Sequence, residues 1–251
     1  MVKDPAQGKK PRYVEIADEL RARIEAGVYA ETGKLPSERM LTEEFDAARN
    51  TVRDALQLLR VDDLIESRGG SGVYLRTFRR IQRDAVARAS REQWGAGRAI
   101  WDKDLQGRSR TEDVKAFKVH PPEHVAQTLG VRGQEVWCRD KLYRAEGRIV
   151  MHSVAWYPTD LVEGTAITEQ NTGPGGTYAR LDEIGHGPAR FSEEIEVRLP
   201  LSEESKMLGI TMSTPIILIV RTAYDSDGRP VEVNEMKLDS DSYRLIYKFT
   251  S

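Results

Sequence analysis

The chain has 251 residues, of which 31% are charged, and its formal net charge is −2. A single cysteine, Cys138, excludes an intrachain disulfide and a cysteine-rich zinc site. No apolar run approaches the roughly 18 residues that a membrane span needs, and the first residues hold no apolar signal segment. We therefore expect a cytoplasmic protein that associates with no membrane.

Residues 13–24 carry apolar side chains at the spacing of an amphipathic helix, which is expected to end near Gly27. Residues 35–75 then predict two short helices and a hairpin with a glycine-rich tip. Pro36 favours an extended backbone before the first short helix, and the hydroxyl of Ser37 can cap it. The long helix is expected to pack behind the two short ones and complete a three-helix core.

The second short helix presents two different faces. One face is an apolar stripe at i, i+3, i+4 and i+7, made by Val52, Ala55, Leu56 and Leu59. The other face shows Arg49, Asn50 and Arg53, and the two arginines project side by side because they are four residues apart. Residues 68–72 (RGGSG) lie between short apolar runs, so their glycines form a hairpin tip that allows close backbone approach. Together these features predict a winged helix-turn-helix, a shape that fits a DNA major groove and the adjacent minor groove.

Charge is unevenly distributed along the chain. The net charge is −2 over residues 1–75, +6 over residues 76–110 and −6 over residues 111–251. The acidic winged segment argues against strong non-specific DNA affinity, which comes mostly from phosphate neutralisation, but specific readout needs only a few side chains. Residues 77–110 lack sustained periodicity, so we interpret them as a linker anchored by Trp94 and Trp101. The arginines of this linker form either a solvated arm or a DNA-contacting arm.

From Val114 onward the pattern alternates between strands and short helices, and it repeats. Each repeat has a short helix ending at Leu-Gly, a strand with an arginine (Arg139 or Arg221), a Gly-Arg turn and a return strand. Two such units predict an antiparallel sheet with helices on one side. Between them, Thr177 can cap a short helix over residues 178–184. Residues 243–249 predict a final strand.

Three spaced motifs, LPSER at 35–39, RNTVRDAL at 49–56 and RGGSG at 68–72, resemble the GntR family of bacterial winged-helix regulators. Downstream, GGTY at 175–178 and DGRPVEV at 227–233 resemble the UTRA effector domain, and this pairing resembles the HutC-type subfamily. The resemblance implies an α+β protein. A winged helix-turn-helix domain is expected over residues 11–76, and an antiparallel-sheet, chorismate-lyase-like UTRA domain for effector binding and dimerisation over residues 111–251.

The resemblance also implies a function. It indicates a homodimeric transcriptional repressor that binds palindromic double-stranded operator DNA and is released by a small-molecule effector, without catalysis and without a cofactor. The positions expected to contact DNA are Ser37, Arg39, Arg49, Asn50, Thr51, Arg53, Arg68 and Gly70. An arginine fork can read guanine, and a glycine lets backbone enter the minor groove. Ala48 and Asp46 replace a serine and a glycine that are frequent in the family, and this is expected to cost about 1 kcal/mol in stability.

The expected effector site departs from that of sugar-phosphate-sensing relatives. Where they use two arginines and a glutamate, this chain has Lys141, Tyr143 and Ser153, while Glu232 is kept and Leu238 replaces a tyrosine. The hydroxyl of Thr177 and the start of the helix beside it can accept an anionic group. The resemblance thus implies a pocket for a ligand other than an amino-sugar phosphate, lined by Lys141, Tyr143, Ser153, Thr177, Tyr178, Glu232 and Asn234.

The sequence is compatible with two other functions. One is an effector-independent DNA-binding regulator of a mobile element that controls conjugal transfer. The other is a lyase-like enzyme that uses Glu232, His152 or Lys141, although the sequence fixes no geometry for them. The four histidines show no ligand-type spacing, so no metal site is expected. A small molecule that weakens operator binding would favour the effector-controlled regulator.

Overall fold

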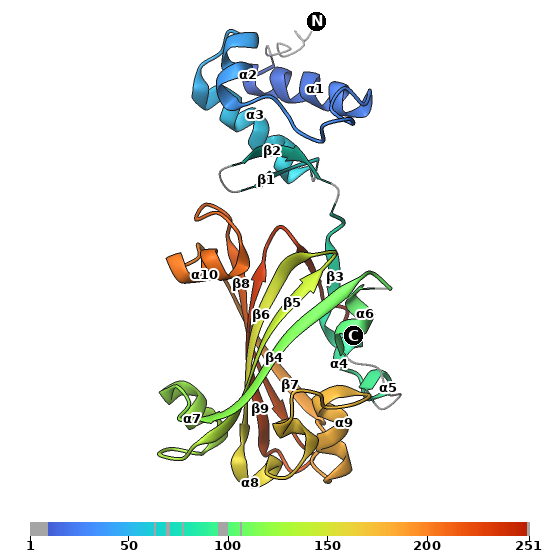
Figure 1. Ribbon diagram of the computed structural model, residues 1–251, viewed down its shortest axis with the longest axis vertical. Helices are drawn as coiled ribbons and strands as arrows, with labels where there is room; N and C mark the ends of the chain where they lie inside the picture. Colours follow the sequence, from blue (N-terminus) through green and yellow to red (C-terminus); the bar gives the residue numbers. More distant parts are fainter. Residues whose placement is uncertain are drawn as a thin grey trace, which may run out of the picture. The chain divides into compact units, whose positions relative to one another are not determined.

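The computed structural model describes residues 10–62, 64–68, 71–76, 78–94, 100–105 and 107–249. The chain divides into two compact units, residues 1–79 and residues 80–251 (Figure 1). Over the described residues, the first unit contains three helices and a two-stranded sheet, and the second is built on a six-stranded sheet.

The first unit is a winged helix-turn-helix, which confirms the predicted fold. Its helices are α1 (Arg12–Glu25), α2 (Glu38–Glu44) and α3 (Arg49–Val61), and its antiparallel wing strands are β1 (Ile65–Arg68) and β2 (Gly72–Leu75). The apolar stripe of α3 is fully buried, as its periodicity indicates. It joins a core that includes Ile16, Leu20, Leu41, Val52, Ala55, Leu56 and Leu59.

Local backbone chemistry determines where α2 and α3 begin. The Ser37 hydroxyl accepts a hydrogen bond from the Met40 amide at 3.3 Å, which confirms the predicted cap of α2. Asp46 has a left-handed φ of 44° in the turn between the helices, a conformation that favours glycine. Ala48 stands at the cap position of α3 and offers no side-chain acceptor. Asp46 and Ala48, the two residues that differ from the family pattern, therefore both lie where the residue type affects a turn or a helix cap.

An antiparallel sheet of six strands organises the second unit, in the order β4-β5-β6-β9-β8-β7. The strands are β4 (Arg110–Val119), β5 (Val136–Ala145), β6 (Arg148–Pro158), β7 (Arg190–Arg198), β8 (Ile216–Tyr224) and β9 (Pro230–Asp239). The predicted repeat is present and is longer than expected. It runs β4-α7-β5-β6 and then β7-α10-β8-β9, where α7 spans Glu123–Leu129 and α10 spans Ser202–Leu208. The two halves meet where β6 pairs with β9.

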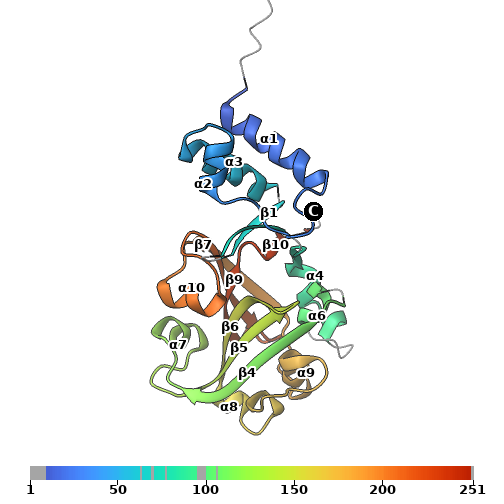
Figure 2. The same cartoon turned by 45° about the horizontal axis from the view of Figure 1, so that its top comes forward.

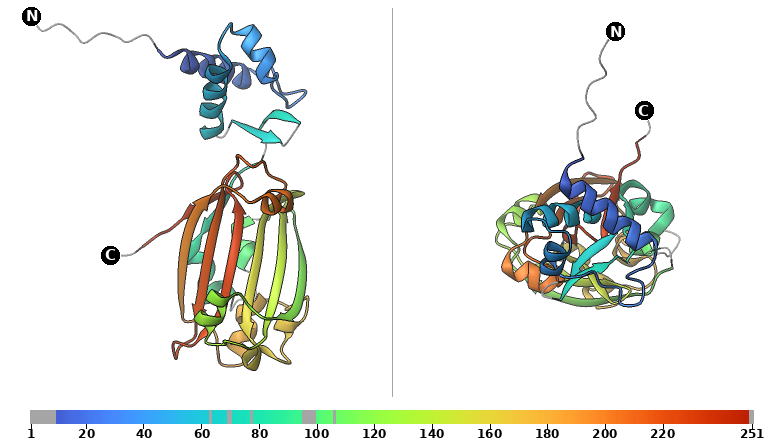
Figure 3. Two further views of the ribbon diagram at one scale, coloured as in Figure 1. Left: turned by 90° about the vertical axis from the view of Figure 1, so that its left-hand side faces the viewer. Right: turned by 90° about the horizontal axis from the view of Figure 1, so that it is seen from above.

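The two repeat helices lie on one face of this sheet, as expected, because His124 of α7 contacts Glu235 and Glu204 of α10 contacts Lys237, two residues further along β9. Other helices cover the second face, which the repeat does not predict. Trp156 packs with Val125 of α7, whereas its neighbour Tyr157 packs with Trp94 and Tyr178. Consecutive strand residues point to opposite faces, so α7 and the segments carrying Trp94 and Tyr178 lie on opposite sides (Figures 2 and 3). The second face carries α4 (Ala85–Ala89), α5 (Arg91–Trp94), α6 (Ile100–Leu105), α8 (Thr159–Val162), η1 (Ala166–Thr168) and α9 (Gly176–Glu183).

The segment expected to be a linker, residues 77–110, differs from that interpretation. It contains β3 (Ile81–Asp84), which pairs in parallel with β10 (Tyr243–Ile246), followed by α4 to α6. The second unit therefore begins near residue 80. Trp94 and Trp101 are buried, as anchors should be. The interpretation as a solvated arm is wrong for Arg83 and Arg88, because both side chains are buried. Arg83 pairs with Glu193, and Arg88 pairs with Asp104.

The physical reason for this difference is the length of the elements. A strand of four residues and helices of four to six residues are too short for a recognisable hydrophobic period. The predicted final strand over 243–249 is likewise shorter, ending at Ile246, and it pairs with β3 outside the six-stranded sheet.

Candidate functional site

The exposed start of α3 brings together the predicted recognition side chains. Arg49, Asn50 and Arg53 are exposed and Thr51 is half-buried. The Nε atoms of Arg49 and Arg53 both donate to one carboxylate oxygen of Glu38, at 3.4 and 3.0 Å. The two guanidinium groups therefore share an anchor on α2. Sequence reasoning did not single out Glu38 as part of this surface.

The remaining predicted DNA contacts lie on α2 and the wing. The Ser37 oxygen caps α2, and Arg39 is exposed and donates to Glu43 on the same helix at 2.5 Å. On the wing, the backbone of Arg68 pairs with that of Gly72. Gly70 and the side chain of Arg68 lie outside the described residues.

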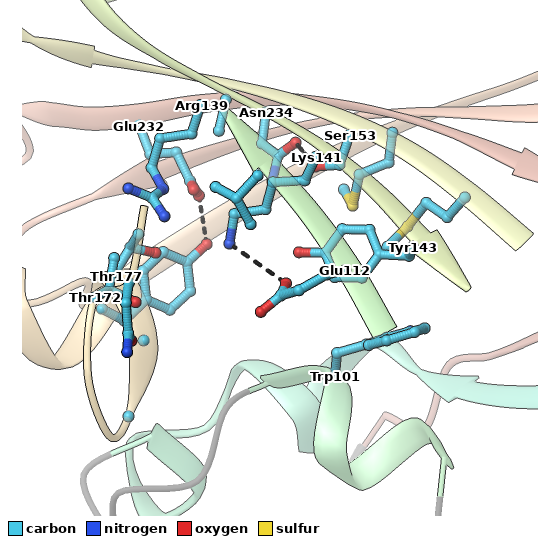
Figure 4. A pocket seen from close by; sticks show the side chains of 18 of the residues that line it. Trp101, Glu112, Arg139, Lys141, Tyr143, Ser153, Thr172, Thr177, Glu232 and Asn234 are labelled. Atoms are coloured by element: carbon cyan, nitrogen blue, oxygen red, sulfur yellow. Dashed lines mark hydrogen bonds and ion pairs between the residues drawn. The ribbon is translucent and has the colours of Figure 1, made fainter. Parts of the chain in front are cut away.

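A cavity of about 680 Å³ opens on the second face of the sheet, within the second unit. Its walls come from β4, β5, β6, β8 and β9, the loop before α9, and two side chains of the segment between β3 and β4, Arg88 and Trp101 (Figure 4). All of the predicted effector residues line it: Lys141, Tyr143, Ser153, Thr177, Tyr178, Glu232 and Asn234. Strand alternation brings together those on β5, β6 and β9, because they share one face.

Glu232 is the centre of a buried polar network in this cavity. Only 1% of the residue is exposed. Its carboxylate accepts hydrogen bonds from the hydroxyls of Tyr157 at 2.6 Å and Tyr178 at 2.5 Å, and Arg221 approaches it at 3.5 Å. Burial raises the pKa of both tyrosines well above the ordinary value, so both remain protonated donors. Sequence reasoning did not assign Tyr157 or Arg221 to the site.

Lys141 places a largely buried ammonium group in the cavity. Its side chain is 18% exposed, and Nζ lies 3.9 Å from the carboxylate of Glu112. Burial lowers the pKa of Lys141, while Glu112 acts in the opposite direction. The ring of Tyr143 packs edge-on against Trp101 with centroids 4.5 Å apart. The cavity thus has an aromatic end at Trp101 and Tyr143, and a polar end near Glu232 (Figure 4).

Arg139 fixes the loop that closes the polar end. Its buried guanidinium donates to the backbone carbonyls of Ile167, Glu169 and Gln170, the last at 2.9 Å. The predicted cap by Thr177 is wrong, because Gly175 holds the cap position of α9 and Thr177 lies within the first turn. A left-handed φ of 82° at Gly175 lets the loop turn directly into the helix.

Arg88 and Trp101 belong to the segment expected to be a linker, so the sequence does not predict their position in the cavity wall. Trp101 is expected as an anchor, but no pattern distinguishes Arg88 from its neighbouring arginines. The described residues form no group of three or more histidine, cysteine, aspartate or glutamate side chains able to hold a metal ion. In the same part of the chain, no helix has the length and apolar composition needed to cross a bilayer.

Comparisons with known proteins match both units. The family described as "Bacterial regulatory proteins, gntR family" matches residues 12–75, and the family described as "UTRA domain" matches residues 105–244. An uncharacterized HTH-type transcriptional regulator of Streptomyces coelicolor is 30% identical over 89% of this chain and 87% of its own length. The mannosyl-D-glycerate transport/metabolism system repressor MngR of Escherichia coli is 29% identical over 95% of each chain.

Solved structures agree with the fold. The crystal structure of PhnF from Mycobacterium smegmatis superposes with a TM-score of 0.59 and covers 94% of this chain and 99% of its own. At 22% sequence identity, this likeness concerns the fold alone.

Proposed function

Because the chain belongs to the GntR family of bacterial regulatory proteins and carries a UTRA domain, we propose that it is a transcriptional repressor that a small-molecule effector releases from a palindromic operator. The observation that carries this proposal is the cavity of about 680 Å³ in the UTRA unit. This volume lies within the range of small-molecule sites, about 300–1,000 Å³. The relative MngR, by its name, is a repressor.

The lining of the cavity favours a polar effector with an anionic group. Its cationic side chains are Arg88, Arg110, Arg139, Lys141 and Arg221, against the carboxylates of Glu112 and Glu232. Within the described part of the chain, Nε and Nη1 of the buried Arg221 have no hydrogen-bond partner. A buried donor without a partner is costly, so an anionic ligand that accepts from Arg221 gains affinity. The hydroxyl of Ser153 and the amide of Asn234, bonded at 2.8 Å, offer further polar contacts.

Chain connectivity provides a route from this cavity to DNA. Arg88 and Trp101 line the cavity and belong to the segment that follows directly after the first unit. A ligand that contacts Arg88 or Trp101 therefore acts on the stretch of chain that continues into the DNA-binding unit. A coupling free energy of about 1–3 kcal/mol gives about 5- to 150-fold relief of repression.

A palindromic operator calls for two copies of the chain. In a homodimer, the two α3 helices would enter successive major grooves about 34 Å apart on one side of the duplex. Light scattering coupled to gel filtration measures the mass of the free protein. A monomeric protein at micromolar concentration that also binds one half-site per chain would contradict the dimer.

The proposal is tested in two steps. The wild-type protein first selects its operator from random duplexes, and a metabolite collection is then screened by thermal shift. Compounds that raise the unfolding temperature are added to the complex with the selected duplex. An effector-controlled repressor yields at least one compound that both stabilises the protein and releases DNA. If every stabilising compound leaves the complex intact, the effector-controlled function is refuted.

A further inference from the structure

Glu38 contacts Arg49 and Arg53, the two arginines of α3 that are proposed to read bases. One oxygen of its carboxylate accepts from Arg49 Nε at 3.4 Å and from Arg53 Nε at 3.0 Å. The arginine side chains are 69% and 52% exposed, whereas that of Glu38 is 27% exposed. A partly buried carboxylate thus links two exposed guanidinium groups across two helices.

Local contacts fix the backbone at Glu38. Glu38 is the first residue of α2, directly after the capping Ser37, and its own carbonyl accepts from the Thr42 hydroxyl at 2.7 Å. Leu41, on the same helix, is fully buried in the core shared with α3. Because α2 is fixed at its start and by its packing, Glu38 approaches Arg49 and Arg53 from a rigid support.

The geometry of the contact leaves the reading atoms of each arginine available. A guanidinium group has five N–H donors in a planar fork, and Glu38 engages only the Nε–H. The four Nη hydrogens can still form the bidentate contact to O6 and N7 of guanine. The contact at Nε also restricts the rotamers of each arginine before DNA binds. Less side-chain conformational entropy is therefore lost on binding.

The carboxylate has a second, electrostatic effect. The two arginines alone carry a charge of +2, and the carboxylate of Glu38 lowers the charge of the cluster to +1 at the surface proposed to bind DNA. Phosphate neutralisation supplies essentially all of non-specific affinity. A carboxylate here therefore penalises binding to any duplex where the arginines gain only phosphate contacts.

We propose that Glu38 is a specificity-determining residue, which positions Arg49 and Arg53 for base reading and disfavours their use on phosphates. This proposal rests on the proposed operator reading by α3. The competing explanation is an ordinary surface ion pair, which contributes little to stability and nothing to discrimination.

Glu44 provides a matched control on the same helix. Its carboxylate pairs with Arg23 of α1, so Glu44→Gln makes the same charge change as Glu38→Gln without touching Arg49 or Arg53. Glu38→Asp keeps the negative charge but shortens the side chain. Comparison with Glu38→Gln therefore distinguishes the effect of side-chain length from the effect of charge. Thermal unfolding of each variant shows whether the fold is retained.

The experiment measures dissociation constants by fluorescence anisotropy, for the duplex selected by wild-type protein and for a scrambled duplex of equal composition, over a range of salt concentrations. For Glu38→Gln we expect tighter binding to the scrambled duplex and a steeper salt dependence there. The ratio of the two constants is expected to fall by about tenfold or more, as when a bidentate base contact is weakened. For Glu38→Asp we expect weaker binding to the selected duplex and unchanged binding to the scrambled one.

The outcomes separate this proposal from the proposed function. Wild-type protein that fails to discriminate between the duplexes would overturn both. The role of Glu38 alone would be overturned if the Glu38→Gln variant discriminates between the duplexes as well as wild type does. It would also be overturned if Glu38→Gln and Glu44→Gln lower this discrimination equally.

Discussion

Replacement of Glu232 by glutamine should strongly destabilise the second unit, because the carboxylate is buried and satisfies three neighbours. Glutamine retains one acceptor oxygen, so one of the two tyrosine hydroxyls, of Tyr157 or Tyr178, loses its partner. Arg221, which is also buried, loses the carboxylate that lies 3.5 Å from its Nη2. Removal of one partner from a buried pair costs about 3–5 kcal/mol. We therefore expect Glu232→Gln to lower the free energy of unfolding by about 3–5 kcal/mol.

Tryptophan fluorescence during urea unfolding measures this unit separately, because all of the tryptophans, Trp94, Trp101, Trp137 and Trp156, lie after residue 80. In the double variant Glu232→Gln, Arg221→Met, the buried positive charge of the Arg221 guanidinium is absent. Its loss of stability should therefore be smaller than the sum of the two single losses. Exposed ion pairs contribute less than about 1 kcal/mol. If Glu232→Gln lowers the free energy of unfolding by no more than this, the stabilising role of the buried Glu232 network would be refuted.

Three further predictions concern α3 and the acid stability of the second unit. Ala48→Ser should raise the free energy of unfolding of the first unit by about 1 kcal/mol by supplying the missing cap, measured by circular dichroism in urea; an unchanged midpoint would contradict it. Arg53→Ala should abolish discrimination between selected and scrambled duplexes in a gel shift while gel filtration shows an unchanged mass; retained selectivity would exclude Arg53 from recognition. Hydrogen bonds from Arg198 hold the pKa of Glu204 at about 2, below its ordinary 4.5. Its contribution, about 3 kcal/mol, is therefore present above pH 4.5 and lost as the pH falls toward 2. Glu204→Gln should accordingly be less stable than wild type at pH 7 and equal to it near pH 2, and a pH-independent difference in urea unfolding would oppose this.

The sequence predicted features that repeat or alternate over enough residues. The stripe of α3 spans two turns, and its four apolar residues are all fully buried. The internal repeat predicted the pairing of β5 with β6 and of β8 with β9. The resemblance to the UTRA domain indicated Lys141, Ser153 and Asn234 as pocket residues, and alternation along the strands explains why they share one cavity. The stripe of α3 depends on a period that the helical backbone imposes.

Features that depend on tertiary contacts could not be predicted in the same way. Arg88 and Trp101 reach the cavity from the segment after β3, a strand that pairs with β10 from the far end of the chain. The bridge from Glu38 to Arg53 connects residues fifteen positions apart on different helices. The cap of α9 went to Gly175 because its left-handed backbone completes the turn one residue before the helix begins. No local pattern encodes these three results.

We propose above all that a ligand in the second unit releases DNA held by the first. The most direct test is an anisotropy titration of the selected duplex, with and without a stabilising compound from the thermal-shift screen. The wild-type dissociation constant should rise by about 5- to 150-fold with the compound. Lys141→Met, within the cavity, should abolish this response and keep DNA binding, whereas Lys115→Met, exposed on β4 and outside the cavity lining, should respond like wild type. A compound that stabilises the protein through Lys141 without changing the dissociation constant would contradict the claim.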